Sequence, residues 1–283
     1  MSAQIINGTQ IASDIKNEVA AEVAALNAAG KYPCLAVVLV GDDPASAVYV
    51  GHKQKVCAET GIKSVTHTLP AETTEAELLA LIDKLNEDTS VHGILVQSPV
   101  PAHIDESKIL LAVSPDKDVD CFHPYNVGLM SVGGGTLLPG TPAGIIQLLK
   151  RSGIEIAGKN CVVLGRSNIV GKPIAMLLLR EHGTITICHS KTENLAAVTK
   201  QADILIVAIR QPRFVTADMI KEGATVIDVG IHRLGGKKLC GDVDFESCKD
   251  VAGHITKVPG GVGPMTIAVL MQNCLAAYRL QNG

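Results

Sequence analysis

The chain has 283 residues, of which 47% are hydrophobic, 19% charged and 2% aromatic, with no tryptophan and a formal net charge of −3. This length accommodates two ordinary domains, each large enough to bury its own core. Charged residues interrupt every apolar run before it could span a bilayer, and few groups are available to neutralise phosphates or stack on bases. We therefore expect neither a membrane protein nor a nucleic-acid-binding protein.

The cysteines, the histidines and the N-terminal segment predict a cytoplasmic protein without a metal site. The eight cysteines form no CxxC pair, and several stand in apolar runs, which is typical of buried free thiols in a reducing compartment. The nine histidines include no HExxH motif, so we expect no structural metal. No basic stretch followed by an apolar segment occurs at Met1, which predicts that the chain carries no targeting peptide.

Apolar runs with the composition of buried strands alternate with segments of helical period. The runs cover residues 34–41, 91–97, 161–165, 184–188, 203–209 and 225–230. Continuous Val/Ile/Leu strands between helices predict parallel sheets covered by helices on both faces, so the expected fold class is α/β. Glycines are expected to end four of the helices, at Gly30, Gly61, Gly153 and Gly183.

A glycine-rich stretch at 129–142 separates two groups of predicted strands, and we place the domain junction there. The first domain is expected to span residues 1–138, and a Rossmann-like second domain residues 139–263. A last helix is predicted from Pro264 to Leu280, and its own pattern does not indicate which domain it packs on.

In the first domain, a helix expected from about Ala45 to Thr60 carries Tyr49 and Lys53. The two residues are four apart and therefore share a face of the helix. A ring and an amine near the end of a parallel strand could stack on a flat ligand and move a proton. The alternative is an ordinary solvated helix, on which tyrosine and lysine often occur at this spacing.

Two further polar residues, Gln97 and Asp120, follow strands and could converge on Lys53. Gln97 could instead cap a strand, and Asp120 a turn. The YxxxK pair also occurs in short-chain dehydrogenases, in which a glycine-rich nucleotide loop precedes the pair. Here the glycine-rich loop follows it, and this order argues against that family.

In the second domain, the strand at 161–165 runs into GRSNIVGKP and then into an apolar helix, the order of a phosphate-binding crossover. Gly165 and Gly171 do not fit the GxGxxG fingerprint, and an ordinary tight turn is the alternative. An NAD site usually has a carboxylate at the end of the next strand. Here that position reads His189, Ser190 and Lys191, which favours the 2′-phosphate of NADP.

Six long segments occur in a characteristic order, namely VGDDPASAVYVGHKQK, HGILVQSPVP, PDKDVD, GRSNIVGKP, CHSKT and KVPGGVGPMT. Together they resemble the bifunctional methylenetetrahydrofolate dehydrogenase/methenyltetrahydrofolate cyclohydrolase family, over essentially the whole chain. The resemblance implies oxidation of 5,10-methylenetetrahydrofolate with NADP and then hydrolysis of the methenyl product to 10-formyltetrahydrofolate. It also implies a folate domain, a Rossmann-like NADP domain with an active cleft between them, a last helix (264–283) that packs back on the first domain, and a homodimer.

The resemblance assigns roles to matching residues. Lys53 would be the catalytic lysine, Tyr49 the ring that stacks on the folate, Gln97 the residue that orients the lysine, and Asp120 the carboxylate that holds the pterin. The residues implied to hold NADP are Gly165, Arg166, Ser167, Ser190 and Ile231. Two more, Pro264 and Thr266, would lie in the substrate cleft.

Two residues depart from the family pattern, Cys121 after KDVD and Arg210 after DILIVA, where the family usually has glycine. A glycine with positive φ at either place would make the replacement disruptive, whereas Arg210 could instead lend charge to the NADP phosphates.

Three other functions stay open. They are a dehydrogenase that has lost hydrolysis, a two-domain NADP oxidoreductase of the shikimate dehydrogenase type, and a catalytically silent NADP-binding protein.

Overall fold

The computed structural model describes residues 2–236 and 238–283, which form two compact units. The three-stranded unit comprises residues 14–138 and 267–283. The six-stranded unit comprises the described residues up to Ser13 together with residues 139–266. Two helices, α1 (Gly8–Ala28) and α10 (Gly263–Asn282), each contribute residues to both units. None of the described helices is long and apolar enough to span a membrane.

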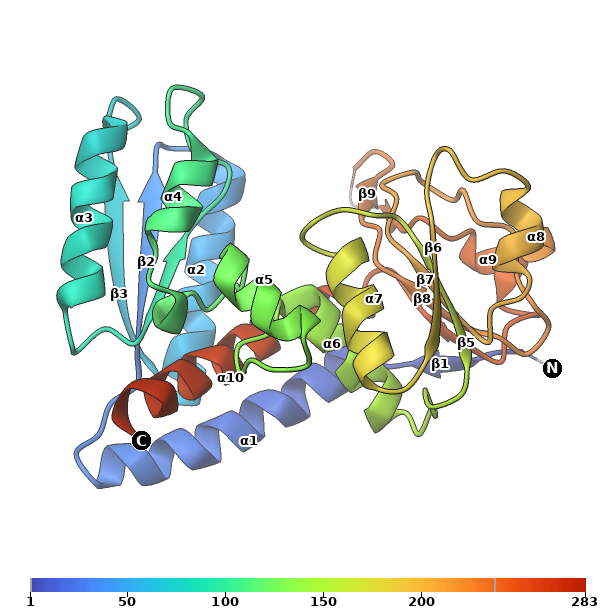
Figure 1. The fold of residues 1–283 in the computed structure, drawn as a ribbon, viewed down its shortest axis with the longest axis horizontal. Helices are drawn as coiled ribbons and strands as arrows, with labels where there is room; N and C mark the ends of the chain where they lie inside the picture. The colour runs from blue at the N-terminus through green and yellow to red at the C-terminus, as the bar shows by residue number, and fades with distance from the viewer. Residues whose placement is uncertain (1, 237) are drawn as a thin grey trace. The chain divides into compact units, whose positions relative to one another are not determined.

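The three-stranded unit is built on the parallel sheet β3-β2-β4, with β2 (Cys34–Val40) between β3 (Lys63–Leu69) and β4 (Gly93–Val96). Every residue of β2 is buried, and alternate side chains point to opposite faces. Leu35, Val37 and Leu39 pack with residues of α1, α2 (Pro44–Thr60) and α10. The intervening residues pack on α3 (Glu75–Glu87) and α4 (Glu106–Ala112), so helices cover both faces (Figure 1). The unit is completed by the 3-10 turn η1 (Pro115–Lys117) and by α5 (Pro124–Ser131).

The six-stranded unit has the strand order β1-β11-β8-β7-β5-β6, and all of its pairings are parallel. Its elements are β1 (Gln4–Ile6), α6 (Gly140–Arg151), β5 (Asn160–Leu164), α7 (Gly171–Arg180), β6 (Thr184–Cys188), α8 (Leu195–Thr199), β7 (Ile204–Val207), η2 (Ala217–Met219), β8 (Thr225–Asp228), the hairpin of β9 (His232–Arg233) and β10 (Leu239–Cys240), α9 (Phe245–Cys248) and β11 (His254–Thr256). In Figure 1, α7 lies on one side of this sheet and α8 and α9 on the other. Strand β5 lies between β6, which follows it in the sequence, and β7, so the chain runs in opposite directions across the sheet before and after this point. Sheets of this kind usually bind ligands at such a switch point.

All six predicted strands are present, with ends that shift by no more than two residues. The parallel α/β class is confirmed, and all eight cysteines are buried and unpaired, as their apolar surroundings predicted. Five of the described strands were not predicted. Edge strand β3 alternates exposed and half-buried residues and so lacks a continuous apolar run. Strands β1 and β11 are only three residues long, and β9 and β10 only two.

The structure corrects two details of the sequence analysis. Residues up to Ser13 were expected in the first domain, but they belong to the six-stranded unit because β1 pairs with β11. Helix α7 was expected to end at Gly183, but the left-handed position after this helix is occupied by His182, with φ of 64°. Gly30, Gly61 and Gly153 do have positive φ, as expected of residues that end helices.

Candidate functional site

The lysine of the first motif lies on helix α2, at the carboxyl end of strand β2. The helix begins where the Asp43 carboxylate accepts a hydrogen bond from the Ser46 N–H at 2.7 Å, followed by Pro44 in the first turn. It ends at Gly61, which has the left-handed conformation that glycine favours. These two caps fix the length of the helix and therefore where its middle turns place Tyr49 and Lys53.

Lys53 and Gln97 meet in the three-stranded unit. The ammonium Nζ of Lys53 donates a hydrogen bond of 2.9 Å to Oε1 of Gln97. The amide of Gln97 is itself fixed, because its Nε2 donates to the Ser98 carbonyl at 2.6 Å, so Oε1 faces the lysine. Tyr49, one turn before Lys53, keeps 58% of its surface exposed, and its ring is open to a ligand.

Asp120 is the charged partner of Lys53. Burial lowers the pKa of Lys53, and the nearby Asp120 carboxylate opposes this shift. Burial also raises the pKa of Asp120 to about 6, against the opposing effect of Lys53. Both groups are therefore shifted towards their neutral forms, which is characteristic of proton-transfer sites in poorly solvated surroundings.

The segment that carries Asp120 is held by buried polar groups which sequence inspection did not identify. Asn273, on α10, donates from Nδ2 to the carbonyls of Val119 and Leu138, both at 2.7 Å. The Asp118 carboxylate accepts from the His123 N–H at 2.8 Å and from Asn126 Nδ2 at 3.1 Å. No local pattern marks these residues, because their partners are distant in the sequence or lie within an irregular loop.

Cys121, which follows Asp120, has φ of 57°, so the chain does need a left-handed conformation at this position. The residue is buried, and its thiol donates to the Leu137 carbonyl at 3.1 Å. Burial raises the pKa of this thiol to about 12, so it stays protonated as a donor near neutral pH. The thiol contact offsets part of the backbone strain that glycine would avoid.

In the six-stranded unit, a pocket of about 760 Å³ opens at the carboxyl ends of β5, β6, β7 and β8. All five residues predicted to hold the cofactor lie on its wall, namely Gly165, Arg166, Ser167, Ser190 and Ile231. His189 also lines it, whereas Lys191 does not. Pro264 and Thr266, in the first turn of α10, are half-buried and lie outside this wall.

The loop after β5 depends on two glycines that bring backbone segments close together. A Cβ atom on Gly165 would lie 2.2 Å from the Ala208 carbonyl oxygen, and one on Gly171 would lie 2.3 Å from the Gly165 oxygen. Gly165 also has φ of 123°, a conformation that residues with a side chain rarely adopt. The Ser167 hydroxyl accepts from the N–H groups of Val170 and Gly171 at 3.2 and 3.3 Å, at the start of α7. The loop thus folds as a phosphate-binding crossover without matching GxGxxG.

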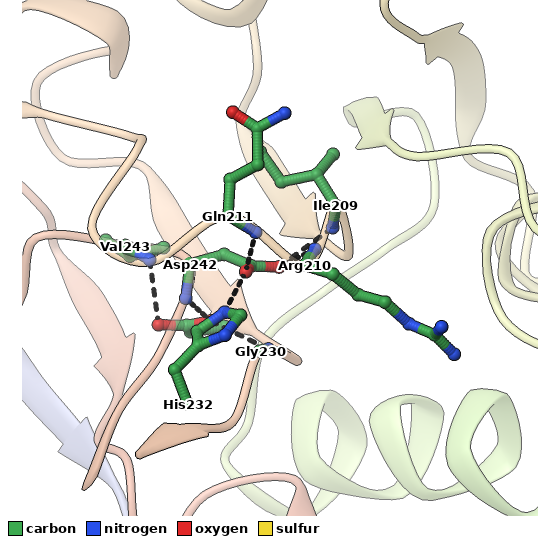
Figure 2. A network of polar contacts seen from close by, with 8 residues as sticks. Ile209, Arg210, Gln211, Gly230, His232, Asp242 and Val243 are labelled. Atoms are coloured by element: carbon green, nitrogen blue, oxygen red, sulfur yellow. Dashed lines mark hydrogen bonds and ion pairs between the residues drawn. The ribbon is translucent and has the colours of Figure 1, made fainter. Parts of the chain in front are cut away.

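Another part of the pocket wall is organised around a carboxylate that was not predicted from the sequence. Asp242 is fully buried, and its two oxygens accept from the backbone N–H groups of Ile209, Arg210 and Gln211. Its Oδ1 also lies 2.7 Å from Nε2 of His232, which lines the pocket. Figure 2 shows these side chains around Asp242.

Comparison with known proteins assigns both units to one family. Residues 6–120 match the model of the tetrahydrofolate dehydrogenase/cyclohydrolase catalytic domain, and residues 139–282 match the model of its NAD(P)-binding domain. The chain belongs to the tetrahydrofolate dehydrogenase/cyclohydrolase family.

Several members of this family are similar over their full length. The bifunctional protein FolD of Lachnoclostridium phytofermentans is 61% identical, over 96% of this chain and 97% of the relative. A crystal structure of the bifunctional FolD enzyme of Campylobacter jejuni has a TM-score of 0.96 and 47% identity, covering 99% of each chain. The Trypanosoma brucei enzyme, solved with NADP and an inhibitor, has a TM-score of 0.93 and 38% identity, covering 99% of this chain and 98% of that one.

The function expected from the sequence motifs is thereby confirmed. The protein is a bifunctional tetrahydrofolate enzyme with a nicotinamide dinucleotide site. It oxidises 5,10-methylenetetrahydrofolate to 5,10-methenyltetrahydrofolate with NADP, and hydrolyses the product to 10-formyltetrahydrofolate. A shikimate dehydrogenase from Thermus thermophilus, at 14% identity and a TM-score of 0.50, shares only the fold.

Proposed function

We propose that Lys53 performs the proton transfer of the hydrolytic step and that Gln97 is its positioning residue. The observation that carries this proposal is the 2.9 Å hydrogen bond between Lys53 Nζ and Gln97 Oε1, in surroundings that lower the pKa of the lysine. The methenyl substrate is cationic, and a lysine that stayed charged would repel it. A lysine with a lowered pKa is partly neutral and can accept a proton near neutral pH.

In this step, water attacks the cationic methenyl carbon and the neutral amine of Lys53 takes the proton that the water loses. The C–N bond to one folate nitrogen then breaks, and that nitrogen takes a proton back from the lysine ammonium. The new hydroxyl group loses its proton to solvent, so the carbon remains on the other nitrogen as a formyl group and one proton is released overall. Gln97 contributes by holding the amine in one direction, since its oxygen accepts from Nζ and its Nε2 is bound to Ser98. Binding of the cationic substrate lowers the lysine pKa further, by charge repulsion.

Tyr49 and Asp120 are proposed to bind the folate. Tyr49 shares a face of α2 with Lys53, and its exposed ring is available to stack on a flat ligand. Asp120 interacts electrostatically with Lys53, so its carboxylate lies near the lysine amine, and it can accept hydrogen bonds from the amino-pterin ring. Asn273 and Cys121 support Asp120 through the backbone on either side of it.

The pocket of the six-stranded unit is proposed to hold NADP through Gly165, Arg166, Ser167, Ser190 and Ile231. When bound, the nicotinamide supplies the hydride acceptor for the first reaction. The pocket fits a dinucleotide because it lies at the switch point of the sheet and because its loop brings backbone N–H groups and a helix N-terminus together. The end of β6 carries His189 and Ser190 and no carboxylate, which suits a 2′-phosphate.

Three further expectations rest on the resemblance to the family. We propose that Pro264 and Thr266 contact the folate from the start of α10, that the enzyme works as a homodimer, and that it acts in the cytoplasm. Light scattering on the purified protein tests the dimer, and a monomer at micromolar concentration would contradict it.

The role of Lys53 is tested by Lys53→Ala, with Lys55→Ala as a matched control on the same helix. The Lys55 side chain is 74% exposed and forms an ion pair with Glu59 on the same helix. We expect Lys53→Ala to reduce methenyltetrahydrofolate hydrolysis at least about 100-fold, with NADPH binding retained, while Lys55→Ala leaves hydrolysis unchanged. Undiminished hydrolysis in Lys53→Ala would defeat the assignment.

A further inference from the structure

Arg210 stands on the pocket wall in a backbone conformation that arginine seldom adopts. It follows strand β7, lines the pocket and has φ of 58°. The left-handed conformation is strained for a residue with a side chain, because its Cβ approaches the following carbonyl oxygen. This conformation is maintained by specific contacts, since the Arg210 N–H donates to Asp242 Oδ2 at 3.1 Å and its neighbours Ile209 and Gln211 donate to the same carboxylate, both at 2.8 Å.

Asp242 is itself anchored from strand β8. The Asp228 carboxylate accepts from the N–H groups of Gly230 and Asp242, both at 2.9 Å, and from that of Val243 at 3.0 Å. This close packing requires glycine at two places. A Cβ on Gly241 would lie 1.8 Å from Asp228 Oδ2, and one on Gly230 would lie 2.5 Å from Asp242. The three consecutive N–H groups at 209–211 are therefore bound to a rigid acceptor (Figure 2).

None of the described residues neutralises the charge of Arg210. Its side chain is exposed, and its guanidinium forms no ion pair or hydrogen bond with any residue in the described part of the protein. Of the described residues on the wall, Asp242 is the only carboxylate, and hydrogen bonds to the loop and to His232 already occupy its oxygens. Arg166 supplies a second guanidinium on the same wall. The described wall of the pocket thus presents two arginine side chains and no carboxylate that is free to pair with them.

We propose that Arg210 binds a phosphate group of the dinucleotide and that Asp242 is the positioning residue that holds it there. The proposal rests on the function of the pocket as the cofactor site. A guanidinium matches phosphate oxygens with two parallel N–H groups, and such charge-assisted bonds are the strong ones. Either the diphosphate bridge, which NAD and NADP share, or the 2′-phosphate, which only NADP carries, provides this chemistry.

The test compares Arg210→Gln with Arg213→Gln, because the chain provides a matched control. Arg213 lies in the same loop, is exposed, has φ of 53° and does not line the pocket. NADPH affinity is measured from the change in nucleotide fluorescence on binding. We expect Arg210→Gln to weaken NADPH binding about tenfold and Arg213→Gln to change it less than about twofold. Equal affinities for wild type and Arg210→Gln, or equal losses in the two variants, would overturn the proposal.

The same titration with NADH identifies the phosphate. Loss of affinity for both nucleotides assigns Arg210 to the diphosphate, and loss for NADPH alone assigns it to the 2′-phosphate. Arg210→Lys keeps the charge and should recover part of the affinity, even if Arg210→Gln folds poorly. An Arg210→Lys variant whose NADPH affinity is no higher than that of Arg210→Gln would contradict a charge-based contact.

Asp242→Asn tests the positioning role. The variant leaves one amide oxygen for four donors, so the loop is released and Arg210 is no longer held at the wall. We expect weaker NADPH binding in Asp242→Asn, and a double variant with Arg210→Gln that is scarcely weaker than either single one. Fully additive losses would show that Asp242 does not act through Arg210. A wild-type protein that binds no NADPH would instead contradict the assignment of the pocket.

Discussion

The surroundings of Lys53 disfavour its charged form, and this has a direct kinetic consequence. Burial lowers the pKa of the lysine below its ordinary value of 10.5, so more of the amine is neutral at any given pH than on an exposed lysine. The neutral amine is the form that accepts a proton from water.

The rate of methenyltetrahydrofolate hydrolysis should therefore rise with pH and level off below pH 10.5. The measurement is the decay of methenyl absorbance between pH 6 and 10, with the Lys53→Ala protein as the blank for the uncatalysed reaction. A catalysed rate that is independent of pH, or that falls as pH rises over this range, would contradict proton transfer to the neutral lysine.

His182 is a residue with a side chain in a backbone conformation that favours glycine. It ends α7 with φ of 64°, is exposed, and its N–H donates to the Leu179 carbonyl at 2.9 Å. This is the position at which helices commonly carry glycine. Because Gly183 follows directly, the left-handed position was predicted one residue too late.

We expect His182→Gly to be more stable than His182→Ala by roughly 0.5–1 kcal/mol, because alanine keeps the left-handed strain that glycine avoids. Urea unfolding of the two variants measures the difference. An alanine variant that is equally stable or more stable would show that the local backbone relaxes to avoid the strain.

At the scale of elements, the contact between the ends of β8 and β10 is the most crowded part of the six-stranded unit that bears on the pocket. Gly241 directly follows β10 and meets the Asp228 carboxylate at the end of β8. Asp228 has its pKa raised to about 6 by burial, against the opposing effect of three backbone hydrogen bonds. Its acceptor geometry leaves no room for a methyl group on Gly241.

Gly241→Ala should therefore destabilise the protein by about 3 kcal/mol or more, since the Asp228 hydrogen bonds must break or the strand ends must separate. The control is Gly128→Ala in α5, where a Cβ meets nothing within 4 Å, and a gain of about 0.5–1 kcal/mol is expected. Both are measured by urea unfolding, and similar effects of the two substitutions would refute the close approach.

Sequence patterns predicted the elements with continuous apolar composition and failed where the signal is short or non-local. Strands such as β2 and β5 are recognisable because both faces are covered, whereas three-residue β1 gains its stability from pairing with β11, about 250 positions further along. Lys53 and Gln97 belong to motifs, but Asp242 and Asn273 act through backbone groups far from them in the sequence. Such contacts leave no local periodicity.

At the scale of the whole molecule, neither unit is a continuous stretch of chain. The described residues up to Ser13 belong to the six-stranded unit, residues 14–138 to the three-stranded unit, residues 139–266 again to the six-stranded unit, and residues from Ile267 to the three-stranded unit. Residues 270–277 of α10 contribute five buried side chains to one core cluster of the three-stranded unit, namely Leu270, Met271, Cys274, Leu275 and Ala277.

A chain that ends at Thr266 should therefore lose hydrolysis, because this core and the Asn273 support of Asp120 are both removed, while NADPH binding persists. Deletion of residues 2–6 should have the reciprocal effect, weakening NADPH binding by exposing the β11 edge. Cyclohydrolase assays and nucleotide fluorescence on both truncations measure this. Loss of both activities in each truncation would indicate that the units do not fold separately.

The last helix also sets the order of events on the ribosome. Residues 14–138 emerge early, yet the side chains that complete their core arrive only after the 128 residues of 139–266 have been translated. At ordinary elongation rates this delay is about 6 to 26 seconds. During that interval the apolar face that α10 covers in the folded protein is exposed, and transiently exposed apolar surface of this kind is what chaperones of nascent chains bind.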